Sequence, residues 1–144
     1  MNIWDYQRIL VRRLIQWALL SLGVGTLMLG GRRFWHASHF WRGVGGQFIG
    51  WALVNLGIAY FGLTTSENRR VALPDPLAPE VLEHEAESLR RLLWINTALD
   101  LLYVAGGRWL VRRGKHGTGW GIVIQGMFLF LFDLFHALAI PNER

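Results

Sequence analysis

Two aspartates and an asparagine stand inside long apolar stretches of this sequence, where charged and amide side chains are rare. Asp100 and Asp133 interrupt the third and fourth apolar segments, and Asn55 lies within an uncharged run over residues 44–63. A carboxylate surrounded by hydrocarbon is costly, so such residues usually face a protein interior or a water-filled cavity. These three positions are therefore the first candidates for chemistry.

Further polar side chains share helical faces with the two aspartates. Asn96, Asp100 and Tyr103 are spaced i, i+4, i+7, which places them on one face of a helix. Asp133 and His136 are spaced i, i+3 on the next helix. We expect six residues to form a polar cluster inside a helical bundle: Asn55, Asn96, Asp100, Tyr103, Asp133 and His136.

Two interpretations of this cluster stay open. In the first, the aspartates share or relay a proton, His136 acts as a shuttle at the mouth, and an ion or small solute is the cargo. In the second, Asp100 bonds to Asn55, Tyr103 or an arginine, and the polar layer only fixes the register of the helices.

Other kinds of site find less support. His36 and His39 have a spacing that suits a metal on a helix, but no carboxylate or thiolate is near, and we expect an aqueous loop. Haem bound between helices would need a second histidine within the apolar segments besides His136. The sequence has no cysteine. We expect no metal, no cofactor and no enzyme, with a membrane enzyme or quinone site at His136 as a third alternative.

The elements that position these residues are helices long enough to cross a bilayer. A hydrocarbon core of about 30 Å needs roughly 20 helical residues. The chain of 144 residues is 52% hydrophobic and 17% charged, and it contains four mostly apolar segments. Tryptophans near the segment ends suit the headgroup level. The sequence therefore predicts an all-α fold: one transmembrane domain forming a four-helix bundle in the lipid bilayer.

The predicted helices cover residues 9–29, 44–63, 79–111 and 118–140. Three prolines predict an exposed loop over 64–79. Pro79 followed by Glu80 is typical of a helix start, so the first part of the third helix should protrude from the membrane.

Small residues at four-residue spacing predict close contacts between helices. They form three pairs: Ser21 with Gly25, Gly46 with Gly50, and Gly117 with Gly121. Such contacts would lie inside the bundle or against a neighbouring subunit. The stretches MLGGRRFW near Leu29 and VAGGRWLV near Ala105 are also alike, which suggests a duplicated helical hairpin.

The net charge of +5 comes from arginines at the edges of the apolar segments. There they anchor helices and meet anionic lipid, so nucleic acid is not an expected partner. Basic residues are shared almost evenly between the two sides, and the absence of acids from the short turns favours the cytoplasm for those turns. The bias toward arginine suggests a bacterium, and hence a multi-pass protein of the inner membrane.

The segments NTALDLLYVAGG (96–107), QGMFLFLFD (125–133) and WALVNLGIAYFGL (51–63) resemble an uncharacterised family of small bacterial four-span integral membrane proteins. This resemblance implies the four-span fold and marks Asn55, Asp100 and Asp133 as the polar residues of the family. It implies no activity.

From these observations we expect a non-enzymatic integral membrane protein that serves as an accessory or interaction subunit of a larger membrane complex. Its partners would be the lipid bilayer and either other membrane subunits or further copies of the chain. The alternative is a small proton-linked transporter or ion-binding protein that uses the intramembrane aspartates.

Overall fold

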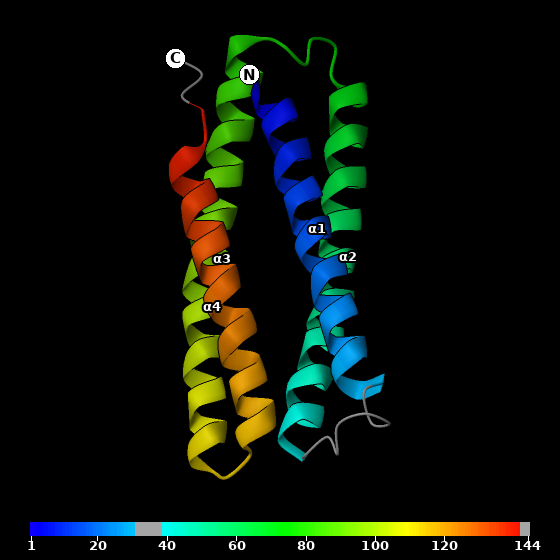
Figure 1. Cartoon of the computed structure of the whole chain (residues 1–144). Helices are drawn as coiled ribbons and strands as arrows, with labels where there is room; N and C mark the ends of the chain where they lie inside the picture. Colours follow the sequence, from blue (N-terminus) through cyan, green and yellow to red (C-terminus); the bar gives the residue numbers. More distant parts are fainter. Residues whose placement is uncertain (31–38, 142–144) are drawn as a thin grey trace.

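The computed structural model describes residues 1–30 and 39–141 and shows an all-α four-helix bundle (Figure 1). The helices are α1 (Ile3–Gly30), α2 (His39–Ala72), α3 (Pro79–Arg112) and α4 (His116–Ala139). The predicted all-α four-helix fold is therefore confirmed. The start of α1, the end of α4 and the α2–α3 connection lie together, at what we call the terminal end (Figure 1). The α3–α4 connection lies at the opposite end, the turn end.

The helices extend beyond the apolar segments that predicted them. α2 continues to Ala72, so the predicted loop over 64–79 is wrong for its first nine residues, and the connection covers only residues 73–78. Thr64 lies within this helix, and its hydroxyl donates to the carbonyl of Tyr60, four residues earlier, at 2.9 Å. Pro74 ends it, since a proline disfavours helical geometry in the residue before it.

Three of the described helices, α1, α2 and α4, are long and apolar enough to cross a membrane. α3 is not among them. Its first half is charged, and Asn96 and Asp100 lower the hydropathy of its second half. The prediction of four spans is thus unconfirmed for α3.

The four helices associate as two hairpins. α1 packs along α2, α3 packs along α4, and the hairpins meet mainly where α2 contacts α4. α1 and α3 have few direct backbone neighbours. This pairing is the arrangement that two repeated hairpins would adopt, although the duplication itself stays a prediction.

Glycines bring the backbones into contact toward the turn end. A Cβ atom at Gly25 would lie 2.8 Å from the carbonyl oxygen of Gly45, and one at Gly107 would lie 2.8 Å from that of Gly119. These contacts close the two hairpins. A Cβ at Gly117 would meet the backbone of Phe40, and one at Gly121 would lie 2.7 Å from Cβ of Gln47, so α2 and α4 also touch closely.

Gly46 and Gly50 behave differently from the other predicted packing residues. Both are exposed, and a Cβ at either would have no described neighbour within 4 Å. The glycines of α2 that pack inside the bundle are Gly43 and Gly45 instead. Contact with a neighbouring subunit, the other option for Gly46 and Gly50, stays a prediction.

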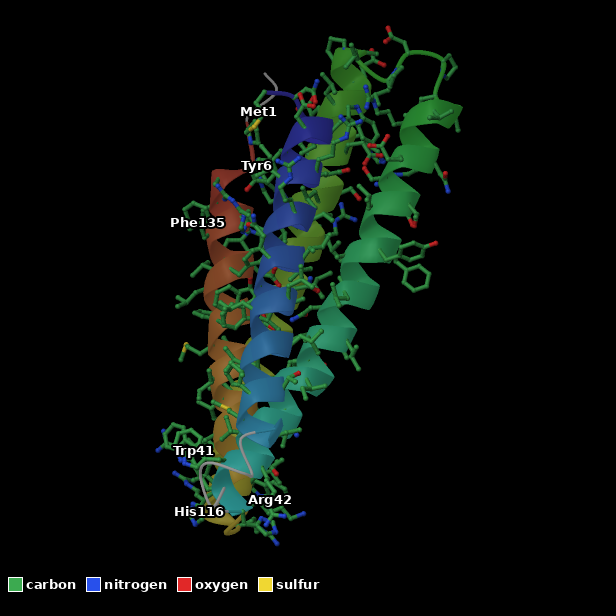
Figure 2. All side chains as sticks on the ribbon, turned by 45° about the vertical axis from the view of Figure 1, so that its right-hand side comes forward. Met1, Tyr6, Trp41, Arg42, His116 and Phe135 are labelled. Atoms are coloured by element: carbon green, nitrogen blue, oxygen red, sulfur yellow. The ribbon has the colours of Figure 1, made fainter. Side chains whose placement is uncertain are left out.

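The terminal end is held by side chains rather than by backbone contact. Ile3, Trp4 and Tyr6 of α1 form the largest apolar cluster with residues from α3 and α4. The indole of Trp4 donates to the carbonyl of Pro76 at 2.8 Å, which fixes the α2–α3 connection over the start of α1. Toward this end α2 leans away from the other three helices (Figure 2).

Candidate functional site

The carboxyl groups of Asp100 and Asp133 lie against each other between α3 and α4. Their residues are 5% and 9% exposed, and the two groups are within hydrogen-bonding reach. Asp100 shares its helical face with the buried Leu93 and Thr97, so the packing of α3 on α4 carries it inward. Two adjacent carboxylates shielded from water repel each other strongly, and such a pair is suited to hold one proton between them.

Two amides lie in the same layer as this carboxyl pair. Asn96, one turn before Asp100, lies near the Asp133 carboxyl, and both residues line the same groove. Asn55 on α2 is 1% exposed. Trp51, one turn before Asn55 on α2, contacts the ring of Tyr103 on the antiparallel α3. Asn55, one turn further along α2, is therefore level with Leu99, which lies one turn before Tyr103, and hence with the carboxyl pair.

Part of this polar layer is unsatisfied. Nδ2 of Asn55 and Oδ2 of Asp100 are buried and have no hydrogen-bond partner among the described atoms. Most buried polar atoms in proteins have a partner, and each exception needs an explanation, such as a catalytic or ligand-binding role.

Tyr103 lies at the edge of the cluster. It is 44% exposed, and its ring meets the ring of Trp51 edge-on, with the centroids 4.9 Å apart. This contact joins α3 to α2 on the turn-end side of the carboxyl pair. Its role in the structure is therefore a bridge between the two hairpins.

His136 is 2% exposed and interacts with α1. Its Nε2 lies 3.2 Å from Nη1 of Arg13, and its Nδ1 lies 2.7 Å from the carbonyl oxygen of Phe132. Because a guanidinium only donates, Nε2 accepts, and we assign the ring proton to Nδ1, which donates to Phe132. A second proton on Nε2 would place two cations in contact. The geometry thus favours His136 as a support for Arg13 over the expected shuttle role.

A second polar network, which the sequence analysis missed, lies at the terminal end. Glu85 of α3 is 7% exposed and receives two hydrogen bonds from Arg69 of α2, at 3.1 and 2.9 Å. Gln7 of α1 lies 3.5 Å from the same carboxylate and accepts from Ser66 of α2. A sequence signal existed, since Glu85 is spaced i, i+4 from the apolar Val81 and Leu89.

A third network joins α1 to α4 nearer the turn end. Gln125 and Ser21 are both 0% exposed. The indole of Trp17 donates to Oε1 of Gln125 at 3.1 Å, and Nε2 of Gln125 donates to Ser21 at 3.2 Å. Ser21, predicted only as a small packing residue, is therefore also a hydrogen-bond partner.

A groove of about 650 Å³ runs between α2 and α3, with α1 and α4 behind it. This volume lies within the range of small-molecule sites. Its walls are mainly apolar and include Leu53, Ile58 and Phe61 of α2, which are more than half exposed and mark the opening toward the side of the bundle. Asn96 and Asp133 reach its surface, so the carboxyl pair borders the groove.

The sequence predicts an aqueous loop around the two histidines whose spacing would suit a metal, His36 and His39. His36 lies outside the described residues, and His39 is exposed at the start of α2. Among the described residues, no three histidine or carboxylate side chains are grouped so that they could hold a metal ion.

Comparison with known proteins gives one match. The model of a family of unknown function (DUF6992) matches residues 13–134, which include Asn55, Asp100 and Asp133 and end before His136. This match confirms the predicted resemblance to an uncharacterised family, although it carries no information on a bacterial origin or on the number of spans. No curated protein and no solved structure matches the chain.

Proposed function

The chain belongs to this family of unknown function, and we propose from its geometry that it is a non-enzymatic membrane protein serving as an accessory subunit of a larger membrane complex. In this proposal the membrane is the inner membrane of a bacterium, and α3 crosses it together with the other three helices. Support comes from its antiparallel packing along α4 and from its exposed apolar side chains, such as Leu99, Leu101 and Leu102. Nitrogen-bearing side chains gather near Arg42 and His116 at the turn end, which favours the cytoplasm for that end (Figure 2).

The observation that carries this proposal is the open face around Gly46 and Gly50 of α2. Glycine within a helix lowers stability by about 0.5–1 kcal/mol relative to alanine. In membranes, small residues at this spacing allow a second helix to approach closely. Within the described chain nothing packs against either glycine. A transmembrane helix of a partner subunit would use this face.

Purification of the full-length protein from its native membrane in a mild detergent tests the proposal. We expect Gly46→Leu and Gly50→Leu to lose the partner protein that accompanies the wild type, while helical content and thermal stability stay unchanged. Gly106→Leu is the matched control, because Gly106 of α3 is also exposed and open. Retention of the same partner by both α2 variants would overturn the proposal. Recovery of further copies of this chain, with no other protein, would also overturn the proposal.

A second candidate, a small proton-linked transporter, is favoured by the contact between Asp100 and Asp133. A carboxyl pair that serves only to fix helix register needs no unsatisfied atoms beside it and no groove at its edge. An exchangeable proton at the pair would give Oδ2 of Asp100 a role, and the groove at the edge of the pair would give that proton access.

Proton flux into proteoliposomes, followed with a pH-sensitive dye while alkali cations or organic amines are added, tests this candidate. Asp100→Asn and Asp133→Asn should reduce coupled flux to the level of empty liposomes. Glu83→Gln, which removes an exposed carboxylate on α3, should leave it unchanged. Wild-type flux in both aspartate variants would rule out the candidate.

A further inference from the structure

The groove between α2 and α3 combines apolar walls with a carboxyl group. Phe61 and Leu92 stand at its exposed edges, Leu14 and Phe132 lie behind, and Asp133 reaches its surface. On α2 the lining runs from Leu53 to Arg69, which at 1.5 Å per residue is about 24 Å. The Trp51–Tyr103 ring contact joins α2 to α3 on the turn-end side.

The charges along the groove favour a cation. Asp133 lies at its surface and interacts with the buried Asp100, so negative charge is concentrated at one level. Arg69 is the one cationic side chain that lines the groove among the described residues, and it is paired with Glu85 through two hydrogen bonds. The groove thus has one acidic centre that no cation of its lining neutralises.

The walls determine what kind of cation fits. A hydrated metal ion would exchange its water for a surface that is mostly aliphatic and aromatic, which is unfavourable. An organic cation with an apolar body would bury that body against leucines, and the rings of Phe61 and Phe132 would add cation–π attraction. A lipid acyl chain would fill the walls but would leave the carboxyl pair without a partner.

We propose that this groove binds a lipophilic organic monocation, with its positive charge beside the Asp133–Asp100 carboxyl pair and its apolar body between α2 and α3. The proposal rests on the second candidate function and names the cargo for it. A pair that holds one proton carries one negative charge, which balances the bound cation. A pair that holds two protons is neutral and releases one of them to water when the cation binds.

Binding of tetraphenylphosphonium to the purified full-length protein, measured by equilibrium dialysis in detergent, tests the proposal. We expect saturable binding at one site, weakened at least tenfold by Asp133→Asn and unchanged by Asp75→Asn in the α2–α3 connection. Binding should strengthen as pH rises, since protons compete with the cation. In weakly buffered solution at a pH where the pair holds both protons, about one proton should appear per cation.

A second variant tests the contribution of the groove walls to binding separately from that of the carboxyl charge. Gly57 lines the groove, and a Cβ at this position would meet nothing within 4 Å. Gly57→Leu should therefore fill the groove and abolish binding without loss of thermal stability. Gly23→Leu is the control, because Gly23 is equally open on α1 and does not line the groove.

The outcomes are distinguishable from those of the functional proposals. Absence of saturable binding, or equal binding by wild type and Asp133→Asn, would overturn the cation site. Displacement of the probe by phosphatidylglycerol but not by other organic cations would show that the groove binds lipid, and would also overturn the cation site. Binding with the expected variant pattern but without transport would uphold the site and overturn proton-linked transport alone.

Discussion

Asp100 and Asp133 place two acidic groups in contact inside a bundle whose other buried residues are mostly apolar. Near them, one nitrogen of Asn55 and one oxygen of Asp100 have no partner in the described chain. The other two polar networks are better satisfied: Glu85 accepts from Arg69 and Gln7, and Gln125 both accepts and donates. This difference separates residues that hold helices together from residues available for a ligand.

The Gln125 network gives a prediction about stability. Gln125→Leu leaves the half-buried Trp17 indole and the buried Ser21 hydroxyl without their partner, so we expect a loss of about 1–3 kcal/mol in unfolding free energy. Reversible unfolding in mixed micelles would measure it. Gln16→Leu, on the exposed side of α1, is the control and should change the free energy little. A loss of equal size in both variants would contradict the assignment.

Arg69 gives a second prediction at this scale. Arg69→Ala leaves the Glu85 carboxylate buried without its main partner, and we expect a loss of about 1–2 kcal/mol, since the half-exposed arginine is partly screened by water. Arg70→Ala, which removes only a 3.9 Å contact with Glu67, should have little effect. The double variant Arg69→Ala/Glu85→Gln should recover part of the loss in the same unfolding measurement.

Among the elements, the glycine contacts decide which helices approach most closely. Gly25→Ala places a methyl group 2.8 Å from the Gly45 carbonyl, so α1 and α2 must separate, and we expect a loss of about 1–3 kcal/mol. Gly23→Ala meets nothing within 4 Å and should be neutral or raise stability by about 0.5–1 kcal/mol. Thermal unfolding of both variants checks this. Equal melting temperatures would show that the hairpin does not depend on the contact.

The sequence predicted the elements well and their partners poorly. Apolar runs and Pro79 located four helices, because burial of apolar residues and helix geometry leave local marks. The extension of α2 over Ser66 and Arg69 left no such mark in the local sequence, because these residues bond to Gln7 and Glu85 on other helices. Spacing identifies a small residue but not the helix that faces it.

The same reasoning applies to the candidate site. Spacing along each helix predicted one polar cluster that contains Asp100 and Asp133, and the structure places their carboxyl groups together. The interaction of His136 with Arg13 on α1 was not foreseeable, because helical spacing fixes the face of a residue but not its partner. The groove depends on the divergence of α2 from α3, a property of the whole bundle that no short segment encodes.

For the whole molecule, the crossing of α3 is open to a direct measurement. The chain has no cysteine, so a single introduced one reports its own surroundings. In intact membranes we expect Leu102→Cys, which is 68% exposed on α3, to resist a water-soluble maleimide. Glu83→Cys, near the start of the same helix, should react readily. Equal reaction at both positions would place the second half of α3 in water.

At the turn end the backbones of α2 and α4 touch, where a Cβ at Gly43 would meet the backbone of Gly117. Along α2, Asn55 lies about 18 Å and Arg69 about 39 Å beyond Gly43, where the backbones touch. A rigid tilt about this point therefore moves the Arg69 level about twice as far as the carboxyl level. The Arg69–Glu85 ion pair therefore joins α2 to α3 at the level where such a tilt would displace α2 the most.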